Sequence, residues 1–182
     1  MTDRVGFKIV DVELNSVNGG SFSVLVAKLK SSRHTSSPFV YQLLKEEERK
    51  GLNSLKPYRD FKKRVFNHRN ELRRFLLDIR SNNKTILGYG ASTKGNVILQ
   101  FCSITQNEIP FIAEVNTDKF GCYTPGTHIP IISEAQARQL NPDYFMVLPW
   151  HFKKNILERE KEYINSGGKL FFPLPFLEVI ER

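Results

Sequence analysis

The sequence lacks the features that mark secreted and membrane proteins. Only two of its 182 residues are cysteines, Cys102 and Cys122, and neither has a C-x-x-C partner or a histidine at metal-ligand spacing. We therefore expect both thiols to be reduced and structural. No apolar run approaches the roughly 18–20 residues that span a bilayer, and the N-terminus lacks the apolar core of a secretion signal. These absences favour a cytoplasmic protein without a membrane partner.

Motifs of several enzyme classes are missing as well. The chain has no G-x-S-x-G elbow, no H-E-x-x-H helix and no Walker sequence. Nothing pairs a nucleophile with a base, so we predict no catalytic residue and no metal site. What is present is material for a packed core, because 40% of the residues are hydrophobic and 14 of them are phenylalanine.

Positive charge is concentrated in one segment. The net charge is +8, and Lys45 to Lys84 holds 13 Lys and Arg against 6 Asp and Glu, an excess of seven. Such a segment could attract nucleic acid, an anionic membrane or a phosphorylated substrate. Its aromatic residues fall on an apolar stripe rather than among the charges. We therefore favour a solvated helical face and expect no nucleic-acid partner.

The N-terminal part predicts a β-hairpin. Two β-rich runs, Val5 to Leu14 and Ser21 to Leu29, are joined by turn residues. An isolated two-stranded hairpin is not stable in water, so this one needs a sheet to join. We assign residues 1–30 to the hairpin and the polar residues 31–39 to a linker.

Helical periodicity follows the linker. After a break at residues 51–57, a second helix is predicted to carry an apolar stripe of Phe61, Val65, His68, Leu72, Phe75 and Ile79. His68 lies on the stripe itself. We expect a structural histidine whose ring nitrogens are satisfied.

Beyond Lys84 the chain alternates short strands and helices, which is typical of a parallel sheet covered on both faces. The predicted strands are Thr85 to Tyr89, Pro110 to Val115, Tyr144 to Leu148 and Lys169 to Pro173; the helices are Thr93 to Cys102, Glu134 to Leu140 and Phe152 to Asn165. The fold class is α/β, with residues 40–182 forming a Rossmann-like domain. Ligands of such sheets bind beyond the carboxyl ends of the strands. Four loops should line that edge: residues 88–94, 114–119, 149–151 and 173–175.

The first of these loops is a glycine turn between a strand and a helix. Gly88 and Gly90 allow a tight turn and close approach of a ligand, and Ser92 or Thr93 can cap the following helix. Thr93 stands where the third glycine of a G-x-G-x-x-G fingerprint would fall. The segment is therefore either an anion site or merely a tight turn.

Polar and aromatic side chains on the loops are the other candidates for ligand contacts. Glu114 follows Gly90 by 24 residues, a spacing that suits a ribose or sugar hydroxyl, although loop carboxylates are common. Trp150 could stack on a ring and His151 could reach a phosphate; Trp150 could equally fill a sheet–helix junction. The rigid loop 121–131 offers hydrogen bonds from Thr127 and His128, or is only a structural turn.

Five blocks together resemble the C-terminal domain of the sugar C-methyltransferases, which use S-adenosylmethionine to methylate a ring carbon of a nucleotide-linked keto-sugar. In order, these blocks are Gly88 to Asn96, Asp118 to Gly121, Thr124 to Ile131, Asp143 to Trp150 and Gly167 to Lys169. The resemblance spans residues 40–182. The hairpin is similar to the last two strands of the family's methyltransferase domain, with Asn18 where the family often has histidine.

The resemblance implies a C-terminal piece of a longer enzyme. The chain lacks the family's zinc-binding cysteine cluster, its cofactor-binding glycine motif and the Tyr-x-Glu-His sequence linked to proton abstraction. It implies no cofactor in this chain, S-adenosylmethionine in the intact enzyme, and a nucleotide-diphosphate sugar as ligand. A stand-alone binding module that pairs with the methyltransferase half or with a second copy through the hairpin is the alternative. A dinucleotide-dependent oxidoreductase fragment is a third.

The hypothesis assigns nine residues to the substrate. Phosphates are assigned to Tyr89, Ser92 and Lys94, and a hydroxyl to Glu114 and Asn116. The nucleotide or sugar is assigned to Thr127, His128, Trp150 and His151.

Overall fold

The computed structural model describes residues 2–182, which divide into two compact units with a boundary between Arg64 and Val65. That boundary falls inside a long helix, α2 (Lys56–Ser81). The division into residues 1–30, 31–39 and 40–182 stays a prediction.

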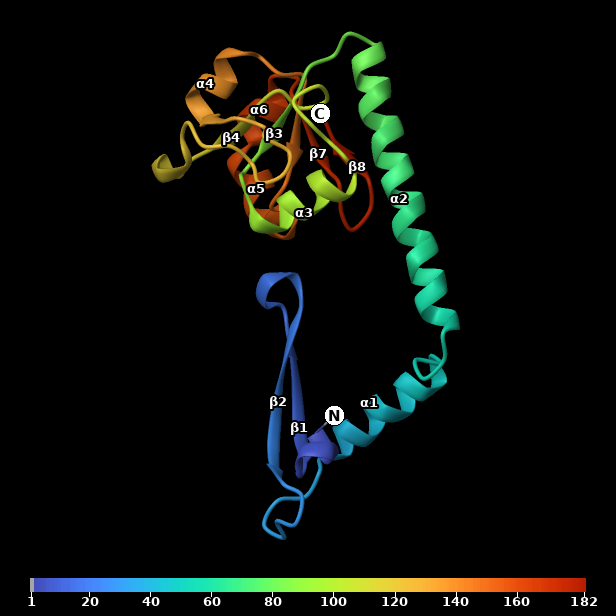
Figure 1. Cartoon of the computed structure of the whole chain (residues 1–182). Helices are drawn as coiled ribbons and strands as arrows, with labels where there is room; N and C mark the ends of the chain where they lie inside the picture. Colours follow the sequence, from blue (N-terminus) through green and yellow to red (C-terminus); the bar gives the residue numbers. More distant parts are fainter. Residues whose placement is uncertain (1) are drawn as a thin grey trace. The chain divides into compact units, whose positions relative to one another are not determined.

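The first unit contains the predicted hairpin, which is confirmed (Figure 1). Strands β1 (Phe7–Asn15) and β2 (Ser21–Lys28) pair antiparallel, after the short helix η1 (Thr2–Val5) and around η2 (Val17–Gly19). The turn needs residues that tolerate positive φ, because Asn18, Gly19 and Gly20 have φ angles of 54°, 85° and 131°. This is why the chain places Asn-Gly-Gly there.

A β-bulge in β1 keeps the hairpin's apolar side chains on one face. The register shifts between Ile9 and Asp11, so Val10 is an extra residue without a cross-strand partner. Side chains alternate between the two faces at every residue, so without a bulge Phe7 and Ile9 would lie on one face and Val12 and Leu14 on the other. The extra residue Val10 brings all four onto the same face. One face therefore carries these side chains: Phe7, Ile9, Val12 and Leu14 from β1 and Phe22, Val24 and Val26 from β2.

The residues after β2 are held against this bulge. Ser37 N donates to Val10 O at 2.7 Å and Ser36 Oγ to Ile9 O at 2.6 Å. Ser37 also caps helix α1 (Pro38–Arg49), because its Oγ accepts a hydrogen bond from Val40 N. The start of α1 is thereby fixed to β1.

The second unit is an α/β domain, and the predicted fold class is confirmed. Its elements after α2 are β3 (Ile86–Tyr89), α3 (Thr93–Phe101), β4 (Ile112–Glu114), η3 (Thr117–Lys119), β5 (Ile131–Ser133), α4 (Glu134–Gln139), β6 (Tyr144–Val147), η4 (Trp150–Phe152), α5 (Lys153–Arg159), α6 (Lys161–Asn165), β7 (Lys169–Phe172) and β8 (Glu178–Ile180).

The strand order is β5-β4-β3-β6-β7-β8, parallel except for the antiparallel edge strand β8. From β3 the chain proceeds to β4 and β5 on one side and then to β6 and β7 on the other. The order of the sheet thus reverses between β3 and β6. In open α/β sheets this switch point, at the carboxyl ends of the strands, is where ligands bind.

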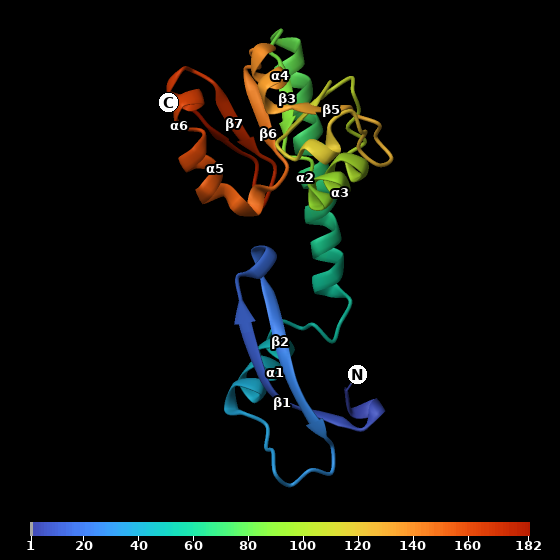
Figure 2. The same ribbon diagram turned by 90° about the vertical axis from the view of Figure 1, so that its left-hand side faces the viewer.

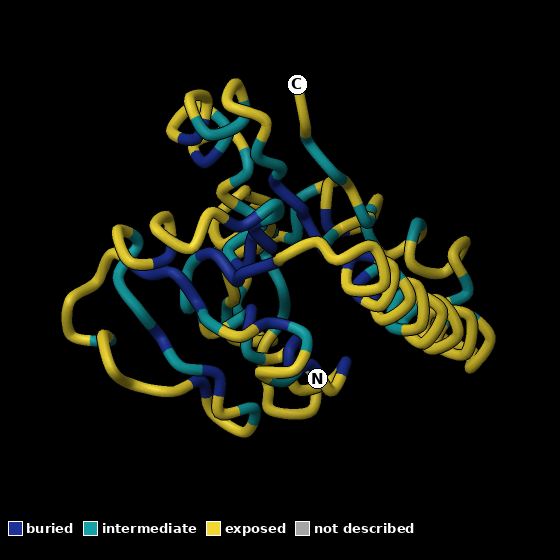
Figure 3. The backbone as a smooth tube through the Cα atoms, turned by 90° about the horizontal axis from the view of Figure 1, so that it is seen from above, coloured by how far each residue is buried: buried dark blue, intermediate teal, exposed yellow. Residues whose placement is uncertain are grey.

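Helices cover both faces of the sheet, as predicted (Figure 2). The part of α2 from residue 65 onward packs with α3 on one face, and α4, α5 and α6 pack on the other. Successive residues of β6 alternate between the two: Met146 joins the first core, whereas Phe145 and Val147 join the second. Both faces are buried, which explains the unbroken apolar runs of the strands. The buried part of the trace gathers at these strands, while much of α2 is exposed (Figure 3).

Three details differ from the sequence predictions. Strands β5 and β8 were not predicted, because Pro130 and Glu178 interrupt their apolar residues, whereas the equally short β4 overlaps the apolar run Phe111 to Ala113. The single helix predicted from Phe152 to Asn165 is interrupted at Glu160, which separates α5 from α6. The expectation that His68 has satisfied nitrogens is wrong: its Nε2 has no hydrogen-bond partner, since the stripe beside it is apolar.

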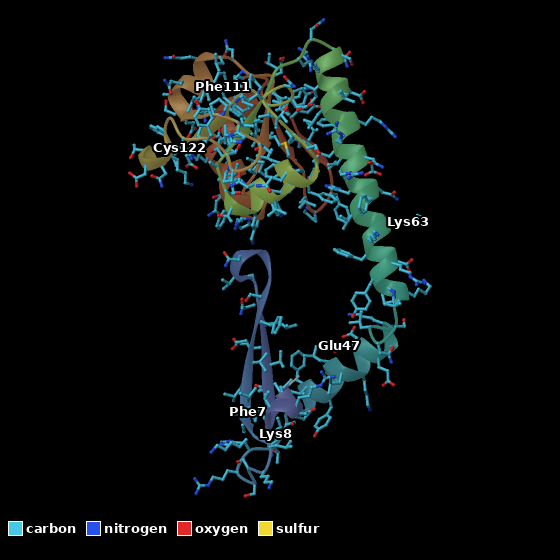
Figure 4. The ribbon with its side chains drawn as sticks, viewed as in Figure 1. Phe7, Lys8, Glu47, Lys63, Phe111 and Cys122 are labelled. Carbon is cyan, nitrogen blue, oxygen red and sulfur yellow. The ribbon has the colours of Figure 1, made fainter. Side chains whose placement is uncertain are left out.

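Within residues 2–182, no helix is both long and apolar enough to cross a bilayer. Over the same residues no group of three His, Cys, Asp or Glu side chains is placed to hold a metal ion. Both cysteines are free thiols; Cys102 is buried, whereas Cys122 is exposed in the loop after η3 (Figure 4).

Candidate functional site

A cleft of about 310 Å³ opens at the carboxyl ends of β3, β4 and β6, beside the switch point. Three of the four predicted loops contribute to it, and residues 173–175 do not. Its walls also include the starts or ends of α4 and α5. The lining residues are Tyr89, Gly90, Ala91, Ser92, Ala113, Glu114, Val115, Lys119, Glu134, Pro149, Phe152, Ile156 and Arg159.

The glycine turn forms one wall, and two of its glycines are required by geometry. Gly90 has φ +79°, and a Cβ there would lie 2.9 Å from Pro149 Cδ. A Cβ on Gly95 would lie 2.6 Å from Leu148 Cβ, so the first turn of α3 packs directly on the end of β6. The third glycine of a dinucleotide fingerprint serves such close helix–strand packing. Gly95 supplies it here, two residues later than Thr93.

Ser92, rather than Thr93, caps α3. Its Oγ accepts a hydrogen bond from Gly95 N at 2.9 Å, and Thr93 is the first helical residue. The hydroxyl of Ser92 is thus part of the cap and also of the cleft wall.

Glu114 holds the turn in place. Its Oε2 accepts hydrogen bonds from Ala91 N at 2.9 Å and Lys119 Nζ at 3.1 Å, and its Oε1 from Val115 N and Asn116 N at 2.8 and 3.0 Å. Burial opposes ionisation of this carboxyl, but these donors outweigh it and lower its pKa. Each oxygen already accepts two bonds, and the predicted hydroxyl contact stays a prediction.

Tyr89 lines the cleft, whereas its hydroxyl group is hydrogen-bonded to Glu160, between α5 and α6. The Tyr89 OH donates to Glu160 Oε1 at 2.8 Å. Burial and the neighbouring Glu160 raise the pKa of Tyr89, so the phenol is a neutral hydrogen-bond donor. Its assignment to a phosphate stays a prediction.

Four charged side chains from α4, α5 and the break before α6 meet beside Tyr89. Arg138 Nη2 donates to Glu134 Oε1 at 2.5 Å and to Glu160 Oε2 at 2.7 Å. Arg159 pairs with the other oxygen of Glu134, and its Nε lies 3.7 Å from Glu160 Oε1. Glu160 is only 1% exposed. Glu134 and Arg159 reach the cleft, and sequence reasoning missed both.

Comparison with known proteins identifies the family of this domain. Residues 16–175 match the C-methyltransferase C-terminal domain. The chain belongs to this family. It is also 35% identical over 175 residues to the C-methyltransferase NovU of Streptomyces niveus, a match that covers 96% of this chain and 41% of that protein. The chain thus spans less than half the length of this relative, and the predicted family membership is confirmed.

The family match covers every loop of the cleft. It also covers Lys94, Trp150 and His151, which do not line the cleft. Trp150 is partly buried and packs against both cores. His151 lies beside it and its Nδ1 has no hydrogen-bond partner. Burial, and then the charge of Lys94, lower the pKa of His151 and favour a neutral imidazole. Lys94 and His151 therefore act on each other electrostatically, next to the glycine turn.

The remaining predicted residues do not line the cleft. Asn116 is exposed, and its Oδ1 accepts a hydrogen bond from Asp118 N at 3.0 Å in the cap of η3. Thr127 Oγ1 lies 2.6 Å from Thr124 Oγ1. His128 is exposed with φ +53°, and its carbonyl accepts a hydrogen bond from Gln106. Thr127 and His128 are thus separated from Tyr89, Ser92 and Glu114, and their ligand roles stay predictions.

The charges at the cleft are balanced. Glu114 pairs with Lys119, and Glu134 and Glu160 pair with Arg138 and Arg159. The walls combine backbone turns, apolar side chains and these paired charges, as ligand pockets commonly do. Such a surface can bind and orient a polar ligand.

Proposed function

We propose that this chain is the substrate-holding C-terminal part of an S-adenosylmethionine-dependent sugar C-methyltransferase. The observation that carries the proposal is the cleft at the switch point of a domain of this family, with a glycine turn and a capped helix start on its wall. The ligand would be a nucleotide-diphosphate keto-sugar. Candidates for its contacts are the nine residues that the sequence hypothesis assigns to the substrate.

The contribution of this domain would be positioning. Holding the sugar in one orientation lowers the entropy that the methyl-transfer step must overcome. The sequence has no match to the glycine motif with which, by the family resemblance, the intact enzyme would bind S-adenosylmethionine. We expect that cofactor to be bound by another part of the intact enzyme.

Calorimetric titration of the whole chain tests the proposal. The ligands are dTDP, a dTDP-linked sugar, S-adenosylmethionine and NADH, each alone. We expect heat from the two thymidine nucleotides only. Binding of NADH alone would favour an oxidoreductase fragment, and binding of S-adenosylmethionine alone would overturn the proposal.

The phosphate end is tested by Lys94→Ala. If the ammonium contacts the diphosphate, its loss should weaken dTDP binding by about 1–3 kcal/mol. Lys154→Ala on α5 is the matched control, because Lys154 is exposed and lies outside the glycine turn, whereas Lys94 belongs to the first turn of α3, although neither lysine lines the cleft. If Lys94→Ala binds dTDP with unchanged affinity, the phosphate site does not include Lys94.

We also propose that the hairpin docks on a β-sheet of the methyltransferase part. Its apolar face leaves Leu14 60% and Phe22 66% exposed, and β2 has β1 as its strand neighbour on one side only. An apolar face beside an unpaired edge favours strand addition. Mixing with a separately produced methyltransferase part of a relative should give a complex by light scattering. A homodimer that excludes the added part would assign the face to a second copy, and a monomer throughout would contradict docking.

A further inference from the structure

Arg159 is the cation of the cleft that can change partner without leaving a buried carboxylate unpaired. Two cationic side chains line the cleft, Lys119 and Arg159. Resting on the proposed function, we propose that Arg159 binds the diphosphate of the ligand, across the cleft from the glycine turn. No motif in the sequence indicates a role for this residue.

Lys119 is committed to the protein. Its Nζ donates to Ala91 O at 2.9 Å and to Glu114 Oε2 at 3.1 Å. The first contact fixes the glycine turn and the second neutralises a carboxylate that is 9% exposed. If Lys119 turned to a ligand, Glu114 would lose its only ion-pair partner seen among the described residues, which is costly for a buried charge.

Arg159 differs because Arg138 duplicates its contacts. With Arg159 removed, Glu134 still accepts from Arg138 Nη2 at 2.5 Å. Glu160 still accepts from Arg138 at 2.7 Å and from the Tyr89 hydroxyl at 2.8 Å. Both carboxylates therefore stay in contact with Arg138, whose single charge they then share.

The exposure of Arg159 also favours exchange. Its side chain is 49% exposed, so a ligand can reach the guanidinium from solvent. A guanidinium donates to phosphate oxygens through a planar pair of N–H groups, and such charge-assisted bonds are shorter and stronger than neutral ones. A diphosphate in the cleft would thus gain a cation, while Arg138 keeps its contacts with both carboxylates.

Placement favours the diphosphate over the uncharged nucleoside as the group that Arg159 contacts. Gly90, Ala91 and Ser92 line the wall at the start of α3, and Arg159 lines the same cleft from the end of α5. An anion between these walls would meet the positive end of the α3 dipole as well as the guanidinium. The uncharged nucleoside would then make no contact with Arg159.

The test compares dTDP with thymidine on the whole chain, by calorimetry and by NMR titration. Arg159→Gln should weaken dTDP binding roughly tenfold or more and leave thymidine binding unchanged. Arg159→Lys should recover part of the loss, because it keeps the charge but not the planar pair of donors. Lys154→Gln on the same helix is the control and should bind both ligands like the wild type.

Thermal unfolding separates binding from a structural role. Arg159→Gln should lower the melting temperature by only about 2–4 °C, as expected for a loss of about 1 kcal/mol in a chain of this size, because Arg138 still contacts both carboxylates. Equal weakening of dTDP and thymidine, or a large loss of melting temperature, would show a structural role and overturn the inference. If the wild type binds dTDP and Arg159→Gln binds it equally well, the inference fails while the proposed function stands. If the wild type does not bind dTDP, both fail.

Discussion

The two units of the chain use their apolar residues in opposite ways. In residues 65–182 the strands bury side chains on both faces of a sheet, in two cores. In residues 2–64 Val40 alone is a buried apolar side chain, and Phe7, Leu14, Phe22 and Leu25 are among those left exposed. Burial of apolar area is the main source of folding free energy. The second unit can therefore stabilise itself, whereas the first leaves apolar side chains exposed.

The difference lies in the arrangement of the strands rather than in their composition. Strand β7 is covered by α2 on one face and by α6 on the other, so Leu170, Phe171 and Phe172 are all buried. Apart from Val10, strand β1 alternates apolar and polar residues, whereas β2 also places Leu25 and Ala27 on the face opposite Phe22, Val24 and Val26. The other described residues of the first unit cover neither face of this hairpin as helices cover the sheet of the second unit.

The strongest test of this comparison truncates a phenylalanine in the second unit. Phe171 is fully buried, and the centroid of its ring lies 4.5 Å from the ring centroid of Phe75. Phe171→Ala should lower the free energy of unfolding by about 3–5 kcal/mol, since it removes buried area and leaves a cavity. Urea unfolding followed by the fluorescence of Trp150, the single tryptophan, measures this loss. A change below about 1 kcal/mol would show that this core is loosely packed.

An intermediate effect is expected at the cleft, from Glu114→Gln. The variant keeps the shape of the side chain but loses the charge that four donors share, and should cost about 1–3 kcal/mol at pH 7. Because the folded state lowers the pKa of Glu114 from its ordinary value of 4.5, the stabilisation is complete above that pH and is lost as the pH falls below it.

Unfolding of wild type and Glu114→Gln should therefore be measured at pH 7 and at several values below 4.5. The difference in free energy of unfolding between the wild type and Glu114→Gln should become smaller as the pH falls. Asp143 also has a lowered pKa, but it is present in both proteins and cancels in the difference. A difference that stays constant with pH would mean that the charge of Glu114 does not stabilise the turn.

The smallest effect is expected from the same truncation in the hairpin. Phe22 is 66% exposed, so Phe22→Ala should change the stability of this chain by less than about 0.5 kcal/mol. Hydrogen exchange of the β2 amides measures it locally. The variant should nevertheless weaken association with a methyltransferase part. A large local destabilisation without a partner would show that the face already packs within this chain.

Much of the second unit could be predicted from the sequence, because its signals are local. Apolar runs such as Tyr144 to Leu148 and a glycine turn after the first strand fix the order of elements and the edge where the cleft lies. Strands β5 and β8 could not be predicted in this way. Neither lies within an uninterrupted apolar run, and each becomes a strand by pairing with β4 or β7.

The charged cluster beside the cleft also lay beyond sequence reasoning. Tyr89 and Glu160 are 71 residues apart, and Arg159 and Glu134 are 25 apart. No spacing along the chain relates residues that only tertiary packing brings together. Gly95 is different: a glycine in the first turn of a helix after a strand is a local sign of close packing, and it could have been recognised.

The extra residue in β1 has a consequence for changes in chain length. Without Val10, the strand Phe7–Asn15 would alternate perfectly, so the bulge absorbs what amounts to a one-residue insertion. The carbonyl of Val10 also accepts a hydrogen bond from Ser37 N, just before α1 begins. Deleting Val10 would therefore keep the alternation of β1 while removing one of the hydrogen bonds that hold the start of α1, beside those to Ile9 and Asp11. The apolar face of the hairpin and the anchoring of the following helix thus depend on different residues of one strand.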